Sequence, residues 1–122
     1  LWPDHCIQHT SGSEFAAGLQ TEKIEKVVYK GSDPKVDSYS GFSDNGNRIQ
    51  TEMHDYLQSE DVTDVFVCGL ATDFCVQFTA RDARSRGYET YFIEDASRGI
   101  SEEGVQAAKK AMLEALKQKL LD

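Results

Sequence analysis

Short apolar runs alternate with helical patterns along the second half of the chain. Residues 64–68 are largely apolar and rich in β-branched side chains, which is typical of a strand buried on both faces of a parallel sheet. Residues 89–93 predict a second strand, and residues 26–30, which end before Gly31, predict a shorter one upstream of both. The pattern therefore predicts a thin parallel sheet of three strands.

Helical spacing of apolar side chains predicts a helix after each of these strands. Residues 49–57 repeat apolar positions three and four apart, and residues 73–86 continue such a pattern up to Gly87, a common residue just past a helix end. Ser101 is a good N-cap for a long final helix, and the two acidic residues after it suit the positive end of that helix. Alternation of strands and helices predicts an α/β fold with right-handed crossovers.

Two stretches outside these elements shape the picture of the whole domain. The first 23 residues lack periodicity and predict an irregular segment, and residues 32–46 form a polar, turn-rich connection of a length that is often functional. The chain opens on Leu1 rather than Met, and a sheet of three strands leaves faces and edges uncovered. We therefore expect residues 1–122 to be the C-terminal part of a single domain that upstream strands or another chain complete.

Composition and charge narrow the class of protein. The 122 residues carry 13 Lys and Arg against 21 Asp and Glu, a net charge of −8, so nucleic acid is not an expected partner. No apolar run approaches the roughly 20 residues of a membrane span. Three cysteines, an odd number, make no disulfide framework, and no secretory signal opens the chain, so we expect a cytoplasmic globular protein.

The candidate chemistry lies at the carboxyl ends of the predicted strands, where open α/β sheets bind their ligands. Cys75 falls in the first turn of a predicted helix, where unpaired N–H groups and the helix dipole favour a thiolate. Lys30 ends the strand that we place beside it, and its ammonium would favour the thiolate further. The same N–H groups could hold a developing oxyanion, so this arrangement suits a nucleophilic cysteine.

Other readings of these residues remain open on the local sequence. A lone cysteine at a strand–helix junction is more often a small buried residue than a nucleophile. Cys68 is assigned to that class because it lies inside an apolar strand, and Cys6 is taken as structural or incidental. An isolated histidine such as His5 is more often a hydrogen-bonded loop residue than a metal ligand, and Trp2 suits either a core or a ring-stacking platform.

Four blocks in fixed order resemble the nicotinamidases of the isochorismatase-like hydrolase superfamily. They are LWPDHC at residues 1–6, YKG at 29–31 with DSYSGF at 37–42, VCGLATDFCV at 67–76, and EDASRG at 94–99. The blocks recur across nearly the whole chain. The resemblance implies a three-layer α/β/α, Rossmann-like hydrolase fold and the hydrolysis of nicotinamide to nicotinic acid and ammonia, a reaction of NAD salvage.

The resemblance also implies roles for the residues around the second cysteine of the VCGLATDFCV block. Cys75 would be the nucleophile that attacks the carboxamide and forms a thioester, which water then hydrolyses. Lys30 matches the active-site lysine of these enzymes. The bond between Leu70 and Ala71 matches a cis peptide, with the backbone amides of Ala71 and Cys75 forming the oxyanion hole.

Further matches concern the metal and the substrate ring. His5 would be a ligand of a divalent metal, most often zinc, with iron or manganese as alternatives. Trp2, Tyr39 and Leu70 would line the ring pocket, and Phe42 is a weaker candidate for the same wall. The family's catalytic aspartate and its other metal ligands match no residue of this chain, so we expect the isolated chain to be inactive without a companion N-terminal segment or a homo-oligomer. Ammonia release by residues 1–122 alone at an ordinary enzymatic rate would contradict that expectation.

Two alternatives accompany the nicotinamidase interpretation. A second member of the superfamily could act on a different amide or on a carbamoyl substrate, although the His5 block argues against it. A truncated, non-catalytic interaction domain is the third interpretation, motivated by the unmatched aspartate and metal ligands.

Overall fold

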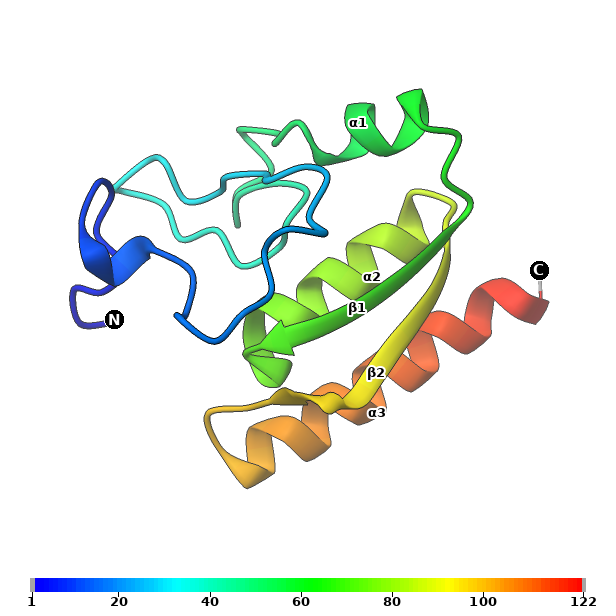
Figure 1. Ribbon diagram of the computed structural model, residues 1–122. Coiled ribbons are helices and arrows are strands. Elements are labelled where there is room, and N and C mark those ends of the chain that lie inside the picture. The colour runs from blue at the N-terminus through cyan, green and yellow to red at the C-terminus, as the bar shows by residue number, and fades with distance from the viewer. Residues whose placement is uncertain (1, 122) are drawn as a thin grey trace.

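The computed structural model describes residues 2–121, with side chains as far as residue 116. Its elements are the 3-10 helix η1 (Ser11–Ser13), α1 (Met53–Ser59), β1 (Asp64–Leu70), the π-helical turn η2 (Thr72–Val76), α2 (Gln77–Ser85), β2 (Glu89–Arg98) and α3 (Glu102–Leu121). Figure 1 shows β1 and β2 side by side with α2 and α3 running along them, while residues 2–50 form a long coil, interrupted by η1, at the upper left of the view.

β1 and β2 form a parallel pair, and η2 with α2 makes the crossover between them. Asp64 pairs with Glu89, and Gly69 pairs with Ser97 after an irregularity in the register. The predicted α/β class with a parallel sheet is confirmed. Within the described residues the helices cover one face of this sheet, because Val67 is buried while Phe66 is 62% exposed.

The predicted strand at residues 26–30 is wrong, and this segment is irregular coil. A strand needs a neighbour to pair its backbone groups, and these residues instead lie against the polar loop and α1 through their side chains. Lys26 forms an ion pair of 2.9 Å with Glu52, and the side chain of Lys30 reaches Ser38. Tyr29 is 82% exposed, so the segment lacks the buried face that stabilises a strand.

The helix predicted over residues 49–57 begins later, at Met53. Residues 49–51 fold back on the polar loop instead, since Thr51 donates its backbone N–H to the Phe42 carbonyl at 2.9 Å and Ile49 accepts from the N–H of Asp44 at 3.1 Å. The polar loop is thereby closed on itself before the helix starts.

The expectation that residues 64–68 are buried on both faces is also wrong. Cys68 is exposed on β1, whose side chains alternate between the helix-covered face and an open face. β-strand side chains point to opposite faces in turn, so one covered face buries only every second residue. Cys68 therefore does not pack in the core, although the sequence predicts that it would.

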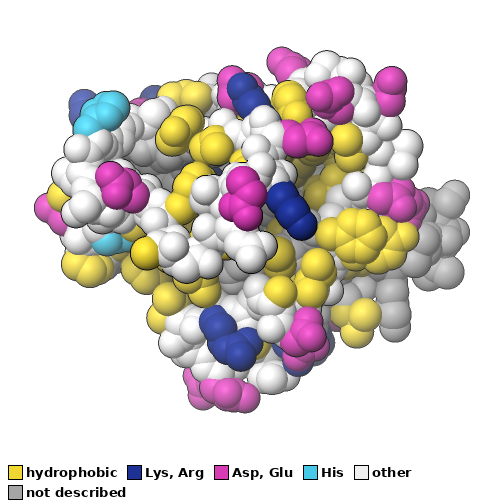
Figure 2. Space-filling view, in the orientation of Figure 1, with side chains coloured by type: hydrophobic (Ala, Val, Ile, Leu, Met, Phe, Trp, Pro, Cys, Tyr) yellow, Lys and Arg dark blue, Asp and Glu magenta, His cyan; other side chains and the backbone are white. Residues whose placement is uncertain are grey.

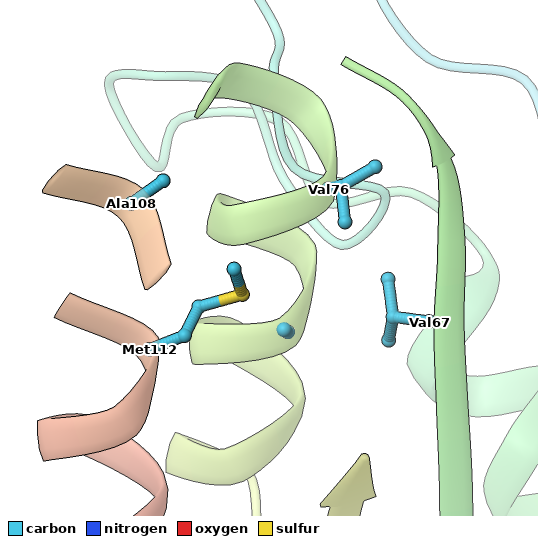
Figure 3. Close-up of a cluster of buried hydrophobic side chains, with 5 residues drawn as sticks. Val67, Val76, Ala108 and Met112 are labelled. Atoms are coloured by element: carbon cyan, nitrogen blue, oxygen red, sulfur yellow. The ribbon is translucent and has the colours of Figure 1, made fainter. Parts of the chain in front are cut away.

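The core lies between β1 and the two long helices. Figure 3 shows Val67 of β1 facing Val76, with Ala108 and Met112 of α3 closing the cluster from the other side; Ala80 of α2 completes it. A second cluster joins the polar loop to α2 through Phe42, Ala83 and Tyr88. Burial of these apolar side chains fixes α2, and with it the turn that precedes α2, against the end of β1.

Hydrogen bonds to one glycine also tie the polar loop to α2. The backbone N–H of Gly41 donates to the Thr79 hydroxyl at 2.9 Å, and the Gly41 carbonyl accepts from the Thr51 hydroxyl at 2.5 Å. Both backbone groups of this half-buried residue are thus satisfied by side chains. The loop that carries Ser38 and Tyr39 is held next to the N-terminal part of α2.

Two side chains have displaced pKa values where the coil meets α1. The hydrogen bond and the charge of Glu52 raise the pKa of Lys26, and desolvation, with Glu60 close by, raises the pKa of Tyr56. Since a raised lysine pKa stabilises the fold while the group stays protonated, this contribution is present below the usual lysine pKa and is lost as pH rises past the raised value. The ion pair of Lys26 and Glu52 therefore stabilises the fold across the neutral pH range.

Candidate active site

Cys75 lies in η2, the turn that begins directly after β1. Gly69, the next-to-last residue of β1, has φ of +116°, a conformation that only glycine adopts without strain. The bond between Leu70 and Ala71 is cis, as the resemblance implied. The Ala71 carbonyl then accepts from the N–H groups of Phe74 and Val76, both at 3.0 Å. The Cys75 thiol is half-buried at this turn.

Lys30 reaches this thiol from the coil. Its ammonium donates to Cys75 Sγ at 3.4 Å and to the backbone carbonyl of Ser38 at 2.5 Å. The carbonyl fixes the direction of the flexible lysine side chain, and the fixed positive charge lies where it stabilises a thiolate. The structure thus brings together the two residues that the sequence analysis placed at neighbouring strand ends, although one of those strands does not form.

An aromatic cluster adjoins the turn. Trp2 donates its indole N–H to the Tyr39 hydroxyl at 2.8 Å, and its ring meets Phe74 edge-on at a centroid distance of 4.9 Å. Tyr39 lies 5.3 Å from Phe74 and is stacked on Phe78 at 5.8 Å. The two residues expected in the ring pocket, Trp2 and Tyr39, are therefore together, next to the nucleophile candidate.

Phe74 and Phe78 were not selected from the sequence. They are spaced four apart, which puts them on one side of the helical run that starts in η2, and this spacing was the available signal. Phe42, the weaker candidate for the same wall, lies elsewhere: it is 1% exposed and stacks on Tyr88 at 6.2 Å in the core. Leu70 is 75% exposed at the end of β1.

His5 lies beside the aromatic cluster, 6.4 Å from the Trp2 ring. Its Nδ1 is 2.6 Å from the Pro3 carbonyl, and because a carbonyl only accepts, Nδ1 is the donor of this contact; in the neutral tautomer that fits it, Nε2 has the lone pair. Over the described residues, no group of three or more His, Cys, Asp or Glu side chains could hold a metal ion. A single histidine does not make a metal centre, so this part of the chain does not fit a metal by itself.

One face of the molecule has a mixed, mainly acidic charge pattern. Figure 2 shows acidic side chains scattered over one face of the molecule with isolated lysines and arginines between them. With a net charge of −8, this face has no clustered positive surface for phosphate groups. In the described part of the chain, no helix has the length and apolar character that crossing a membrane requires.

Comparisons with known proteins find relatives over most of the chain. The nicotinamidase of Escherichia coli (strain K12) is 44% identical over 101 residues, 83% of this chain and 47% of the relative. PnC1 from L. infantum, solved in complex with nicotinate, is 37% identical with a TM-score of 0.90 over 94% of this chain and 58% of that one. The pyrazinamidase of Pyrococcus horikoshii, solved in complex with zinc, is 36% identical with a TM-score of 0.81 over 94% and 60%.

The extent of these matches identifies the family. The chain spans about half the length of the curated relatives it matches, 47% of the Escherichia coli protein and 51% of the one from Schizosaccharomyces pombe. The model of the isochorismatase domain matches residues 1–119, which is nearly the whole chain. The turn that carries Cys75, the lysine beside it and the aromatic cluster all lie within that match, and the chain belongs to the isochorismatase family.

Proposed function

We propose that the protein is a nicotinamidase, which hydrolyses nicotinamide to nicotinic acid and ammonia and so returns the pyridine ring to NAD synthesis. The observation that carries this proposal is the 3.4 Å contact between Lys30 Nζ and Cys75 Sγ, next to the aromatic cluster of Trp2, Tyr39 and Phe74. The 44% identity to a curated nicotinamidase and the likeness to a nicotinate complex support it. The three cysteines are free, which suits the reducing cytoplasm as its compartment.

In the proposed reaction, the Cys75 thiolate attacks the carboxamide carbon while the Lys30 ammonium stabilises the thiolate before attack. The backbone amides of Ala71 and Cys75 would hold the negative oxygen of the tetrahedral intermediate. Collapse of that intermediate breaks the C–N bond, and the nitrogen takes up a proton from solvent and leaves as ammonia. Water then attacks the thioester and breaks the C–S bond, which releases nicotinic acid, restores the thiolate and returns one proton to solvent.

The reaction class is tested by a substrate panel with the full-length protein. Ammonia release is measured with nicotinamide, with pyrazinamide and with N-carbamoyl compounds at equal concentrations. We expect turnover of the two aromatic amides and none of the carbamoyl compounds. Preferential turnover of a carbamoyl compound would instead favour another activity of the family.

The aromatic cluster is proposed to bind the pyridine ring, with Leu70 at its rim. Flat aromatic side chains recognise a flat ring by stacked and edge-on contacts worth about 0.5–1.5 kcal/mol each beyond burial. Trp2→Ala should therefore raise KM for nicotinamide about tenfold, with a smaller change in kcat. Tyr39→Phe, which loses only the 2.8 Å hydrogen bond to Trp2, should raise KM less. Steady-state kinetics on both variants check this, and an unchanged KM for Trp2→Ala would exclude the cluster as the ring site.

A companion segment is proposed to complete the domain. Phe66 and Tyr91 are stacked at 4.7 Å on the open face of the sheet and are 62% and 44% exposed, an apolar pair that favours cover. The chain also spans about half the length of its curated relatives. A segment that corresponds to the unmatched part of those relatives would be suited to cover the open face of the sheet. The same segment would supply the aspartate and the metal ligands that match no residue here.

His5 is proposed as one ligand of a divalent metal, with zinc as the first candidate, once such a segment supplies the others. Its support is the protonated Nδ1, which leaves Nε2 free to bind a metal, and the zinc complex of the Pyrococcus horikoshii relative. Metal content is measured on purified full-length protein by mass spectrometry. His5→Ala should lose most of the bound metal, whereas His9→Ala, which changes another exposed histidine, should keep it. Equal metal content in both variants would contradict the assignment.

A further inference from the structure

A buried carboxylate two residues before Cys75 has no part in the proposed reaction. We propose that Asp73 is a positioning residue, whose carboxylate locks the turn that carries Cys75 onto the loop between β2 and α3. This inference rests on the proposed function for its kinetic consequence, although its effect on the thiol can be measured without any substrate. It also assigns a purpose to Ser97 of the EDASRG block, residues 94–99, which the proposed reaction leaves without one.

The hydrogen bonds of the Asp73 side chain lead to that loop. Its side chain leaves η2 with 6% of the residue exposed, and Oδ1 accepts the backbone N–H of Ile100 at 3.0 Å. Oδ2 accepts the backbone N–H of Ser101 at 3.3 Å. A charged carboxylate is costly to bury unless its oxygens are hydrogen-bonded, and these two N–H groups meet that need. The turn and the loop are therefore joined through one side chain.

One glycine leaves space that this carboxylate fills. A Cβ atom at Gly104, in the first turn of α3, would lie 2.5 Å from Asp73 Oδ2, whereas a Cβ at Gly99 would first meet Val105 Cγ2 at 2.1 Å and would lie 3.0 Å from Oδ1. Contacts under 3.0 Å between such atoms force one of them to move. Glycine in a helix is destabilising relative to alanine by roughly 1 kcal/mol, so Gly104 is an unfavourable choice for helix formation alone. Its presence fits a site shaped around the carboxylate.

A second buried side chain from the same segment holds the other end of the turn. Ser97 is 6% exposed, accepts the backbone N–H of Gly69 at 3.2 Å and donates to the Ile93 carbonyl at 2.9 Å. Gly69 is the next-to-last residue of β1, and Asp73 is the second residue of η2. The turn is thus fixed before and within η2 by residues 97–101, and the direction of the Cys75 side chain is fixed with it.

Fixing this turn matters because the charged partner of Cys75 comes from a distant part of the chain. Lys30 lies on an exposed coil, and Ser38 orients it independently of η2. The 3.4 Å contact between Nζ and Sγ persists only while η2 stays in place, and a misplacement of about 1 Å at a reacting group can cost about a hundredfold in rate. The role of Asp73 is to hold that geometry through hydrogen bonds rather than to act on the thiol by its charge.

Charge and position make opposite predictions for Asp73→Asn. If the carboxylate acted by its negative charge near Cys75, removing it would favour the thiolate and speed alkylation of Cys75. If Asp73 acts by position, asparagine keeps one acceptor but presents an N–H₂ group to the second backbone N–H, and the turn loosens. Alkylation at pH 7 then slows, and kcat falls by about tenfold to a hundredfold while KM changes by less than about threefold.

The test measures two quantities on the full-length protein: nicotinamide turnover, and the rate of alkylation of Cys75 by iodoacetamide without substrate, resolved by peptide mass spectrometry. Gly104→Ala is the second variant, since it retains every hydrogen-bonding group and pushes on Oδ2 from α3. It should slow alkylation of Cys75 and lower kcat in the same direction as Asp73→Asn. Cys6 is exposed and distant in sequence, and its alkylation rate in the same samples serves as the internal reference.

Two further variants distinguish the effect of the Asp73 contacts on Cys75 from a general loss of stability. Gly104 Cβ would also lie 2.8 Å from the Ser101 hydroxyl that caps α3, so Ser101→Ala measures the loss of that cap alone and should lower the melting temperature with little change in kcat. Gly18→Ala, with no atom within 4 Å of the added methyl, should change neither kcat nor the rate of Cys75 alkylation.

The outcomes distinguish this inference from the proposed function. Unchanged Cys75 alkylation and kcat in folded Gly104→Ala, or faster alkylation in Asp73→Asn, would overturn the positioning role. Should Asp73→Asn not fold, Gly104→Ala decides alone. A wild-type protein that does not hydrolyse nicotinamide would overturn the proposed function, while the alkylation rates would still decide whether Asp73 positions the thiol.

Discussion

Replacing Cys75 with alanine should abolish the release of ammonia from nicotinamide, lowering kcat by at least about 10⁴-fold, since loss of a covalent nucleophile removes the whole two-step route. Binding should survive, because the aromatic cluster of Trp2, Tyr39 and Phe74 does not depend on the thiol. The Kd of nicotinamide for Cys75→Ala, measured by calorimetry, should stay within about threefold of the KM of the wild type. A loss confined to kcat identifies a group that acts in the chemical step.

The other two cysteines provide matched controls for this result. Neither Cys6 nor Cys68 lies in η2, and Lys30 donates to Cys75 instead, so Cys6→Ala and Cys68→Ala should retain turnover within about twofold. Acid quenching during turnover should trap a nicotinoyl group on the peptide that contains Cys75. Full activity in Cys75→Ala, or an acyl group trapped on Cys68, would refute the assignment of the nucleophile.

The sequence predicted which residues lie at the site more accurately than it predicted the secondary structure in which each of them lies. The prediction of a strand at residues 26–30 is wrong, yet Lys30 lies 3.4 Å from Cys75 because its long side chain extends from a coil and is directed by the Ser38 carbonyl. Strand propensity describes how well a segment fits a pleated, half-buried surface. Whether such a surface exists beside residues 26–30 depends on tertiary pairing, which local pattern does not contain.

The same distinction explains the burial of β1. The apolar run at residues 64–68 predicts cover on both faces, but within the described residues α2 and α3 cover one face, and Cys68 with Phe66 lies on the other. The apolar pattern of residues 64–68 is typical of a strand in a sheet covered on both faces. The exposure of each side chain depends on which segments cover the sheet in this structure. The run therefore predicted the strand correctly and the position of Cys68 incorrectly.

The polar contacts around Cys75 could not be derived from spacing. Asp73 begins a predicted helix and Ser97 follows the end of a predicted strand, and their partners are backbone N–H groups from a different part of the chain. A backbone N–H group is present at nearly every residue, so the sequence of the partner segment does not indicate such a contact. The contact becomes visible only in the folded structure. Phe74 and Phe78, by contrast, carried a helical spacing of four residues and could have been selected.

Replacing Lys30 with methionine should slow turnover of nicotinamide by about a hundredfold, because the variant keeps the length of the side chain but removes the charge beside Sγ. A hydrogen bond to a charged group contributes roughly 1.5–3 kcal/mol, or about ten- to a hundredfold, and exposure of Lys30 to solvent weakens the ground-state part of that effect. We therefore expect alkylation of Cys75 at pH 7 to slow by about tenfold, less than kcat.

The pH dependence of alkylation shows whether the lysine acts through its charge. At about pH 10 an ordinary thiol is ionised without help, so the rates of Lys30→Met and wild type should converge there. Lys30→Arg, which retains a positive charge, should restore alkylation at pH 7 more than turnover, since a planar guanidinium does not reproduce the contact with the Ser38 carbonyl. Lys35→Met removes an exposed lysine of the same coil and should leave both rates unchanged. If Lys30→Met and Lys35→Met alkylate equally fast at pH 7, the ammonium does not stabilise the thiolate, and the contact between Nζ and Sγ has no catalytic consequence.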